Sequence, residues 1–307
     1  MKFVLWGYPL HSDTYSYVHE GFKKTLELDG HEVFWFHDDD YPEDFDYDNC
    51  VFFTEGYADK NIPLRKTSTY YVHVCVNPNK YLGNVKKLID MRYHQDKMDN
   101  DNYEFDHDIN DFEVLDTGVC IDRDESKEKG YDISYVAWAT DLLPHEFNED
   151  WVNIERENVY YFIGSISPTG RFANKHLIDR FAELCSTRGV KTVWSNPWTN
   201  PLDGDVMRQL MQKSFLSPDL RNATHAAWGT KTCRIFKSIS YGQLGLTNSP
   251  KLAEFAGPLV ICRENIDELF EEGLRLREDK DRIIQQMRYV KQHHTYANRI
   301  NGLLKLL

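Results

Sequence analysis

The first 36 residues constrain the fold more than any other part of the sequence. Residues 2–6 have the pattern of a buried strand that stops at Gly7, a helical pattern follows over about 12–29, and residues 32–36 have a second strand pattern. A strand, a helix and a strand in this order predict a β-α-β unit with parallel strands. Short apolar runs with polar ends recur at 50–53, 70–74, 158–163, 190–194 and 259–261, and further strands are expected at 114–120, 133–138 and 214–216. We therefore expect an open α/β fold.

The length of 307 residues suits two α/β domains of about 150 residues each. We expect a first domain of 1–150 and a second of 151–307, with the polar stretch 145–156 as the linker. No apolar run approaches the roughly 18 residues that a membrane helix needs, and the chain starts in a strand without the regions of a signal peptide. The six cysteines are far apart in the sequence. These features predict a cytoplasmic protein without an integral membrane segment.

The net charge of −13 is unevenly distributed, because the first half is strongly acidic and the second half is basic. A basic second half suits a phosphorylated ligand. An acidic first half argues against broad contact with a nucleic-acid backbone, although an acidic solvated surface explains it equally well. The charge alone therefore predicts a ligand class for the second half only.

The stretch from Cys233 to Ser249 predicts an anion site. A short helix starts near Arg234, Gly242 follows it, and an apolar strand then ends on Thr247-Asn248-Ser249. Open α/β folds place their ligands beside such strand ends. Arg234 supplies a cationic fork, and hydroxyl and backbone N–H groups can bind the other oxygens of a phosphate.

The run RIFKSISYGQLGLTNSPKLAEFAG and the later run KQHHTYANRINGLLKLL resemble the end of a GT-B glycosyltransferase, near its spore-protein-like and family-4-like groups. In that family an R-x-F-E-x-x-x-x-G-x-x-x-x-T helix and strand bind the nucleotide diphosphate, and an HTY-x-x-R helix closes the chain. The resemblance covers about the last third of the chain well and the rest only in layout.

The resemblance implies two Rossmann-like domains that face each other across a cleft, with a C-terminal helix that crosses back to the first domain. It also implies that Arg234, Lys237, Thr247 and Asn248 contact the donor. Lys237 stands where the family usually has an acidic residue, which would bind the donor sugar or the ribose hydroxyls. The loop 217–229 should hold the nucleotide base or the ribose.

A second donor contact is predicted at the loop that begins with Gly164 and Ser165 and ends with Arg171. This loop lies between a strand pattern and a helical pattern over 172–187. A Gly-Ser turn lets the backbone approach a phosphate, and Arg171 adds positive charge. The loop lacks the ending of a P-loop and the glycine spacing of a dinucleotide site, and a plain strand-to-helix connection is the alternative.

Candidate catalytic residues follow the strands of the first half. His11 can take a proton from an acceptor hydroxyl near neutral pH, and Asp13 can orient it. The alternative is that Asp13 caps the helix and His11 is an ordinary loop residue. Glu55 and Asp141 follow later strands and are further candidates for a base or an acceptor ligand.

The acidic run 37–40 invites comparison with the metal-binding D-x-D of the other glycosyltransferase fold. The loop that follows it is equally acidic, so a solvated turn is the preferred interpretation. Residues 94–113 are rich in carboxylates and amides but lack regular ligand spacing, which indicates an irregular surface segment. We expect no metal site.

The resemblance, together with the polar strand ends, implies a metal-independent glycosyltransferase that moves a sugar from a UDP- or GDP-linked donor to a hydroxyl of a glycan or another acceptor. No cofactor is expected besides the donor. A DNA-modifying glucosyltransferase of the same fold, with a hydroxymethyl base as its acceptor, is one alternative. A non-catalytic module that binds nucleotide sugars or glycans is the other, suggested by Lys237.

Overall fold

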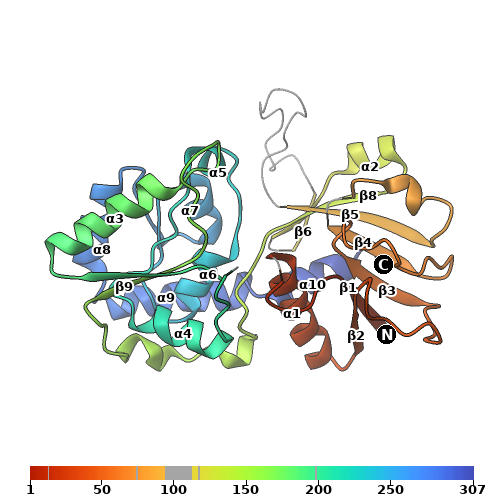
Figure 1. Cartoon of the computed structure of the whole chain (residues 1–307), viewed down its shortest axis with the longest axis horizontal. Coiled ribbons are helices and arrows are strands. Elements are labelled where there is room, and N and C mark those ends of the chain that lie inside the picture. Colours follow the sequence, from red (N-terminus) through yellow and green to blue (C-terminus); the bar gives the residue numbers. More distant parts are fainter. Residues whose placement is uncertain (13, 74, 94–112, 117, 198) are drawn as a thin grey trace. The chain divides into compact units, whose positions relative to one another are not determined.

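The computed structural model describes residues 1–12, 14–73, 75–93, 113–116, 118–197 and 199–307. It divides into two α/β units, which Figure 1 shows in the colours of the sequence. The first unit holds the described residues up to Asp141 and also Tyr296–Leu307, and the second unit is Leu142–Thr295. The chain therefore returns to the first unit for its last helix.

The first unit is built on one eight-stranded sheet of order β2-β1-β3-β4-β5-β8-β7-β6. The neighbours from β2 to β8 pair in parallel, and β7 and β6 add an antiparallel edge. The central strands β3 and β4 are buried throughout, as expected for a parallel sheet that is covered on both faces. The strands are β1 (Lys2–Trp6), β2 (Glu32–Phe36), β3 (Cys50–Thr54), β4 (Thr69–His73), β5 (Lys87–Tyr93), β6 (Glu113–Asp116), β7 (Val119–Ile121) and β8 (Asp132–Val136).

Two helices of the first unit that are far apart in the sequence, α1 (Thr14–Leu28) and α10 (Tyr296–Leu304), pack against each other. Gly21 permits this contact, because a Cβ atom added there would lie 2.1 Å from the ring of Tyr296. The buried Arg299 donates from Nε to the carbonyl of Ala137 at 2.9 Å and from Nη2 to that of Trp138 at 3.2 Å. The prediction that the C-terminal helix crosses back to the first domain is confirmed. The unit also contains α2 (Arg123–Lys129) and the 3-10 helix η1 (Pro78–Lys80).

Replacing Gly21 with alanine should destabilise the protein by about 1–3 kcal/mol, because the new methyl group overlaps the Tyr296 ring. Urea unfolding, with the midpoint compared at a constant slope, measures the effect. Gly204→Ala is the matched control, since no atom lies within 4 Å of its added Cβ. Equal midpoints for the two variants would show that α1 and α10 tolerate a larger separation.

The second unit contains two short parallel strand pairs that one extended segment connects. β9 (Val159–Ile163) pairs with β10 (Lys191–Ser195), and β11 (Leu246–Thr247) pairs with β12 (Ile261–Cys262). The segment 214–219 bonds to both pairs, from Phe215 N to Val159 O at 2.8 Å and from Asp219 N to Leu246 O at 2.8 Å. The resulting order is β10, β9, segment 214–219, β11, β12.

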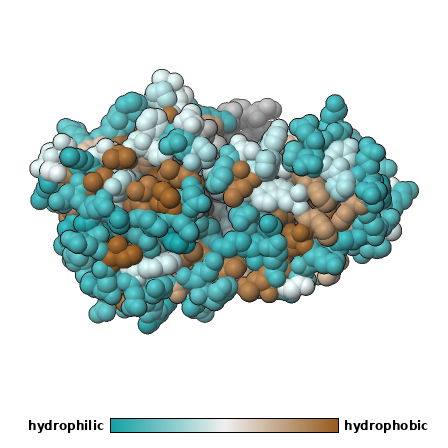
Figure 2. Space-filling view, turned by 60° about the horizontal axis from the view of Figure 1, so that its bottom comes forward, coloured by the Kyte–Doolittle hydropathy of each residue, from teal (hydrophilic) through white to brown (hydrophobic). Residues whose placement is uncertain are grey.

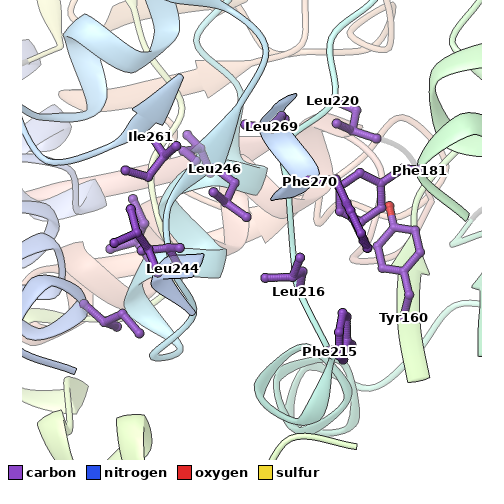
Figure 3. Close-up of a cluster of buried hydrophobic side chains, with 14 of the residues drawn as sticks. Tyr160, Phe181, Phe215, Leu216, Leu220, Leu244, Leu246, Ile261, Leu269 and Phe270 are labelled. Carbon is purple, nitrogen blue, oxygen red and sulfur yellow. The ribbon is translucent and has the colours of Figure 1, made fainter. Parts of the chain in front are cut away.

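Helices of the second unit bury a large hydrophobic core against these strands. The ring of Phe181 lies 4.9 Å from that of Tyr160 and 5.3 Å from that of Phe270, and Figure 3 shows these three side chains together. The helices are α3 (Lys175–Thr187), α4 (Gly204–Lys213), α5 (Ala223–Ala227), α6 (Cys233–Ser240), α7 (Pro250–Ala256), α8 (Ile266–Leu276) and α9 (Lys280–His293), with the 3-10 helices η3 (Pro144–Glu146) and η4 (Glu149–Asn153).

The surface in Figure 2 is mostly hydrophilic, with separate apolar patches. In the part of the chain that the structure describes, no helix combines the length and the apolar character needed to cross a membrane.

Four expectations from the sequence were wrong in detail. The single strand expected near 114–120 is the hairpin of β6 and β7, because Gly118 has φ 83° and reverses the chain. The expected strand 214–216 is an extended segment without strand assignment. The stretch 145–156 is no free linker, since Arg288 binds Glu149 at 2.7 Å within the second unit. The loop 217–229 contains the short helix α5.

Candidate functional site

The strand order creates one switch point in each unit. In the first unit the chain passes from β1 to β2 on one side and then to β3 on the other side of β1. In the second unit it passes from β9 to β10 and then to the segment 214–219 on the other side of β9. Ligands of open α/β sheets bind at the carboxyl ends of the strands at such points. These two edges are therefore the candidate sites.

Gly164 and Arg234 meet at the switch point of the second unit. Gly164 follows β9, and a Cβ atom added to it would lie 2.1 Å from Nη2 of Arg234. The Arg234 guanidinium donates to the carbonyl of Ile163, and its Cζ lies 4.6 Å from the centre of the Phe162 ring. Trp194 fixes the turn from another side, since its Nε1 donates to the carbonyl of Gly164 at 2.7 Å. Two predicted donor contacts that are 70 residues apart in the sequence thus lie together.

The start of α6 is held by a buried carboxylate that the sequence analysis missed. Oδ2 of Asp219 accepts a hydrogen bond from the backbone N of Ile235 at 3.1 Å, in the first turn of α6. The same carboxylate binds Arg221, with Nη2 to Oδ2 at 2.6 Å and Nε to Oδ1 at 2.5 Å. Both residues lie in the loop 217–229, which was expected to contact the nucleotide but carries no motif that singles them out.

Thr247 and Asn248 are buried, and their side chains support neighbouring backbone groups. Asn248 accepts from the backbone N of Arg221 at 2.6 Å through Oδ1 and donates to its carbonyl at 2.8 Å through Nδ2. Thr247 Oγ1 accepts from the backbone N of Ser249 at 3.2 Å. The tip of β11 therefore fixes the Arg221 loop beside α6.

The loop from Gly164 to Arg171 contacts α5 at its end, where Thr224 Oγ1 donates to the carbonyl of Arg171 at 2.8 Å. Ser165 is exposed, and its carbonyl accepts from Nδ2 of Asn174 at 3.0 Å. Arg171 is also exposed, and its Cζ lies 4.5 Å from the Phe172 ring and 5.4 Å from the Trp228 ring. The predicted phosphate loop thus presents a stacked, oriented guanidinium.

Positive charge accumulates around this corner of the second unit. Burial, together with the charges of Arg221 and Arg171, lowers the pKa of His225 to about 4, while Asp219 opposes the shift. His225 is therefore neutral near pH 7. Lys237 in α6 is only 9% exposed, so any charge on it acts in surroundings that screen it weakly.

In the first unit, Glu55 connects the tips of β1 and β3. Its side chain is fully buried, and Oε1 accepts from the backbone N of Tyr8 at 2.8 Å. Gly7 leaves the room for this carboxylate, since a Cβ atom there would lie 2.2 Å from Oε1. Glu55 thus holds the loop that follows β1 in place.

His11 lies in the same loop in a conformation that is rare for residues other than glycine, with φ 73°. Its Nδ1 is 3.3 Å from the hydroxyl of Tyr17. Asp13 lies outside the described residues. The backbone carbonyl of Asp141 accepts a hydrogen bond from Lys24 Nζ at 2.9 Å. The side-chain Oδ1 of Asp141 lies 3.4 Å from the hydroxyl of Thr140.

The acidic turn 37–40 is organised by Asp38. Its carboxylate accepts from the backbone N of Lys60 at 2.8 Å, from that of Asn61 at 3.0 Å and from Trp6 Nε1 at 3.0 Å. Most of the acidic segment 94–113 lies outside the described residues. Among the residues that are described, no three His, Cys, Asp or Glu side chains come together as a metal site would require.

No protein-family model matches the chain, and no curated protein sequence matches it. Three solved alpha-glucosyltransferase structures are similar to it, each at 10% sequence identity. The complex with UDP has a TM-score of 0.59, and the complex with UDP-glucose and DNA containing an abasic site has 0.56, each over 99% of this chain and 98% of that chain. A complex with UDP and a 13-mer DNA containing an HMU base has 0.53 over 100% and 99%. The predicted GT-B fold is confirmed.

Proposed function

We propose that this protein is a glycosyltransferase that moves a sugar from a nucleoside-diphosphate sugar to an acceptor hydroxyl. The observation that carries the proposal is the meeting of Gly164 and Arg234 at the switch point of the second unit, in a chain with the GT-B fold. The similar structures contain UDP or UDP-glucose, which makes a UDP-linked sugar the first donor to test.

In this proposal the second unit binds the donor. Arg234 and the turn at Gly164 and Ser165 take oxygens of the diphosphate, and Arg171 and Lys237 add charge that stabilises the departing diphosphate. Thr247 and Asn248 act through the Arg221 loop, because their side chains are bonded to backbone groups. Fixed cations can supply this stabilisation without a metal ion.

The first unit binds the acceptor. The acceptor oxygen forms a bond to the anomeric carbon of the donor sugar while the bond from that carbon to the diphosphate oxygen breaks. His11 takes the acceptor proton, since it lies in the loop at the switch point and is only partly buried. Glu55 keeps that loop in place and is a positioning residue, because it is fully buried beneath Tyr8. The proposed role of Asp141 is to bind the acceptor.

Thermal unfolding with UDP, GDP, ADP, TDP and CMP, with and without EDTA, tests the donor site. We expect one nucleoside diphosphate to stabilise the protein by about 2.7 kcal/mol at 100 times its dissociation constant, because it binds only the folded state. The stabilisation should survive EDTA. If no nucleotide shifts the transition, the donor assignment fails. Binding without hydrolysis or transfer of the sugar would instead indicate a non-catalytic module.

A DNA acceptor is the second candidate, because two of the similar structures contain DNA. The acidic first half of the chain argues against a DNA acceptor, because the phosphates of a DNA backbone bind to Lys and Arg side chains.

A further inference from the structure

We propose that the acceptor is a neutral sugar, bound by the first unit against the rings of Tyr15, Tyr57 and Trp138; the proposal rests on the glycosyltransferase function proposed above. These rings come from three separate elements, and each lies at the carboxyl edge of the sheet. Tyr57 follows β3, Tyr15 is in the first turn of α1, and Trp138 follows β8.

The three rings form one cluster, in which the Tyr15 ring lies 6.0 Å from that of Tyr57 and 6.3 Å from that of Trp138. Tyr57 is 53% exposed, although its ring is large and apolar, so it offers a surface to a ligand. Tyr15 is partly buried, and Trp138, at 8% exposed, mainly supports the Tyr15 ring. Sites for small ligands combine such rings with a few polar groups. The apolar C–H face of a sugar ring fits the rings, and its hydroxyls fit the polar groups.

A polar group is available beside the rings. Tyr15 and Trp138 line a small cavity of about 10 Å³ together with His73. His73 is 5% exposed, and its Nε2 has no hydrogen-bond partner among the described residues. A cavity of this size accepts about one water-sized group. A sugar hydroxyl satisfies a neutral imidazole nitrogen as either donor or acceptor, so it suits this position.

The charges around the cluster favour a neutral ligand over a polyanion. The described residues 7–12, 37–49 and 137–141, which follow β1, β2 and β8, include no Lys or Arg, and 37–49 are rich in carboxylates. The segment 55–68, which follows β3 and carries Tyr57, contains both cations and carboxylates: Lys60, Arg65 and Lys66 beside Glu55 and Asp59. Arg92 lines the cavity, but it is bound by Asp90 at 2.9 Å and by both oxygens of Glu125 at 3.0 Å. A nucleic-acid backbone needs cations that are available to its phosphates. A neutral sugar has no such requirement.

The test measures transfer of labelled sugar from the donor that the thermal-unfolding experiment identifies. The acceptors are the methyl glycosides of glucose, galactose, mannose and N-acetylglucosamine and, separately, an oligodeoxynucleotide that contains hydroxymethylcytosine. We expect transfer to a glycoside. Tyr57→Ala should raise the KM for that glycoside about tenfold and leave the KM for the donor unchanged, because only the acceptor loses an apolar contact. Leu28→Ala is the matched control, since Leu28 is as exposed as Tyr57, at 52%, and lies at the opposite end of α1 from Tyr15.

The outcomes separate this proposal from the function on which it rests. Transfer to the oligodeoxynucleotide alone overturns the neutral-sugar acceptor and leaves the glycosyltransferase in place. Hydrolysis of the donor with no transfer to any glycoside overturns it in the same way. An equal KM for the glycoside in Tyr57→Ala and Leu28→Ala overturns the ring cluster as its site. Failure to bind any nucleotide removes the proposed function itself.

Discussion

Arg234→Ala should weaken donor binding roughly 10- to 100-fold, because a hydrogen bond to a charged group contributes about 1.5–3 kcal/mol. The guanidinium is oriented before any ligand arrives, since it bonds to the carbonyl of Ile163 and lies over the ring of Phe162. Because the Arg234 guanidinium is already held in place, it can bind the diphosphate without first having to be ordered. The loss should appear as a higher dissociation constant for the nucleoside diphosphate, measured by titration calorimetry.

Two controls separate this loss from a general defect of the second unit. Arg188→Ala removes the same charge from an exposed ion pair with Glu271 at 3.0 Å, and it should leave the dissociation constant unchanged. Arg234→Lys keeps the charge but loses the fork, so it should bind with intermediate affinity. Equal affinity in wild type and Arg234→Ala, with both folded, would contradict the phosphate assignment.

A variant of the first unit should behave in the opposite way. His11→Ala should keep donor affinity and lower the rate of transfer, because His11 is proposed to act on the acceptor proton and not on the donor. Together, the Arg234 and His11 variants assign binding and turnover to different units of the chain. A loss of donor affinity in His11→Ala would contradict this division.

Much of the fold could be predicted from local sequence patterns. β2 has the bounds that the apolar pattern gave, and α6 begins one residue before the expected start at Arg234. β5 and α2 were not predicted. β5 contains Asp90 and Arg92, whose charges hide its apolar alternation, and these charges are explained by the ion pairs of Arg92 with Asp90 at 2.9 Å and with Glu125 at 3.0 Å. A contact between side chains of different elements is invisible to a local pattern.

The sequence indicated the positions of candidate residues that follow strands, but it did not indicate which side chains are buried. Gly164 and Arg234 were singled out by position, and the topology brings them together. Asn248 was expected to contact the donor, but its amide bonds to the backbone of Arg221. Asp219 carried no signal, because an acid in a loop usually indicates solvent and only the packing shows that it is buried against α6.

The first unit should lose stability as the pH falls, because it buries two neutral histidines. His19 in α1 is fully buried, and neither ring nitrogen has a hydrogen-bond partner among the described residues. Burial lowers the pKa of His19 to about 3. The pKa of His73, whose ring lies 5.4 Å from that of His19, is lowered by burial and by the neighbouring charge that His19 would carry. Both groups therefore resist protonation in the folded state.

The sign of the effect follows from the unfolded chain, in which a histidine has a pKa of about 6.5. Above that pH neither state binds the proton, and the stability is fully present. Below it the unfolded state binds protons that the folded state rejects, so stability falls by about 1.4 kcal/mol per pH unit for each histidine, until the pH reaches the folded pKa of about 3 for His19. At pH 5 the loss from His19 is about 2 kcal/mol, a large part of a typical total of about 5–15 kcal/mol.

His19→Leu should remove this part of the acid sensitivity, because leucine fills a similar volume and has no group to protonate. The variant should lose about 2 kcal/mol less than the wild type between pH 7.5 and pH 5, measured as the free energy of unfolding in urea. His176→Leu replaces an exposed histidine of α3 and should keep the wild-type difference. The rings of Trp35 and His73 flank His19, so the leucine has an apolar surface to pack against. If the free energy of unfolding of wild type and His19→Leu depends on pH in the same way, His19 is protonated or hydrated in the folded state. The two buried histidines would then not account for the acid sensitivity.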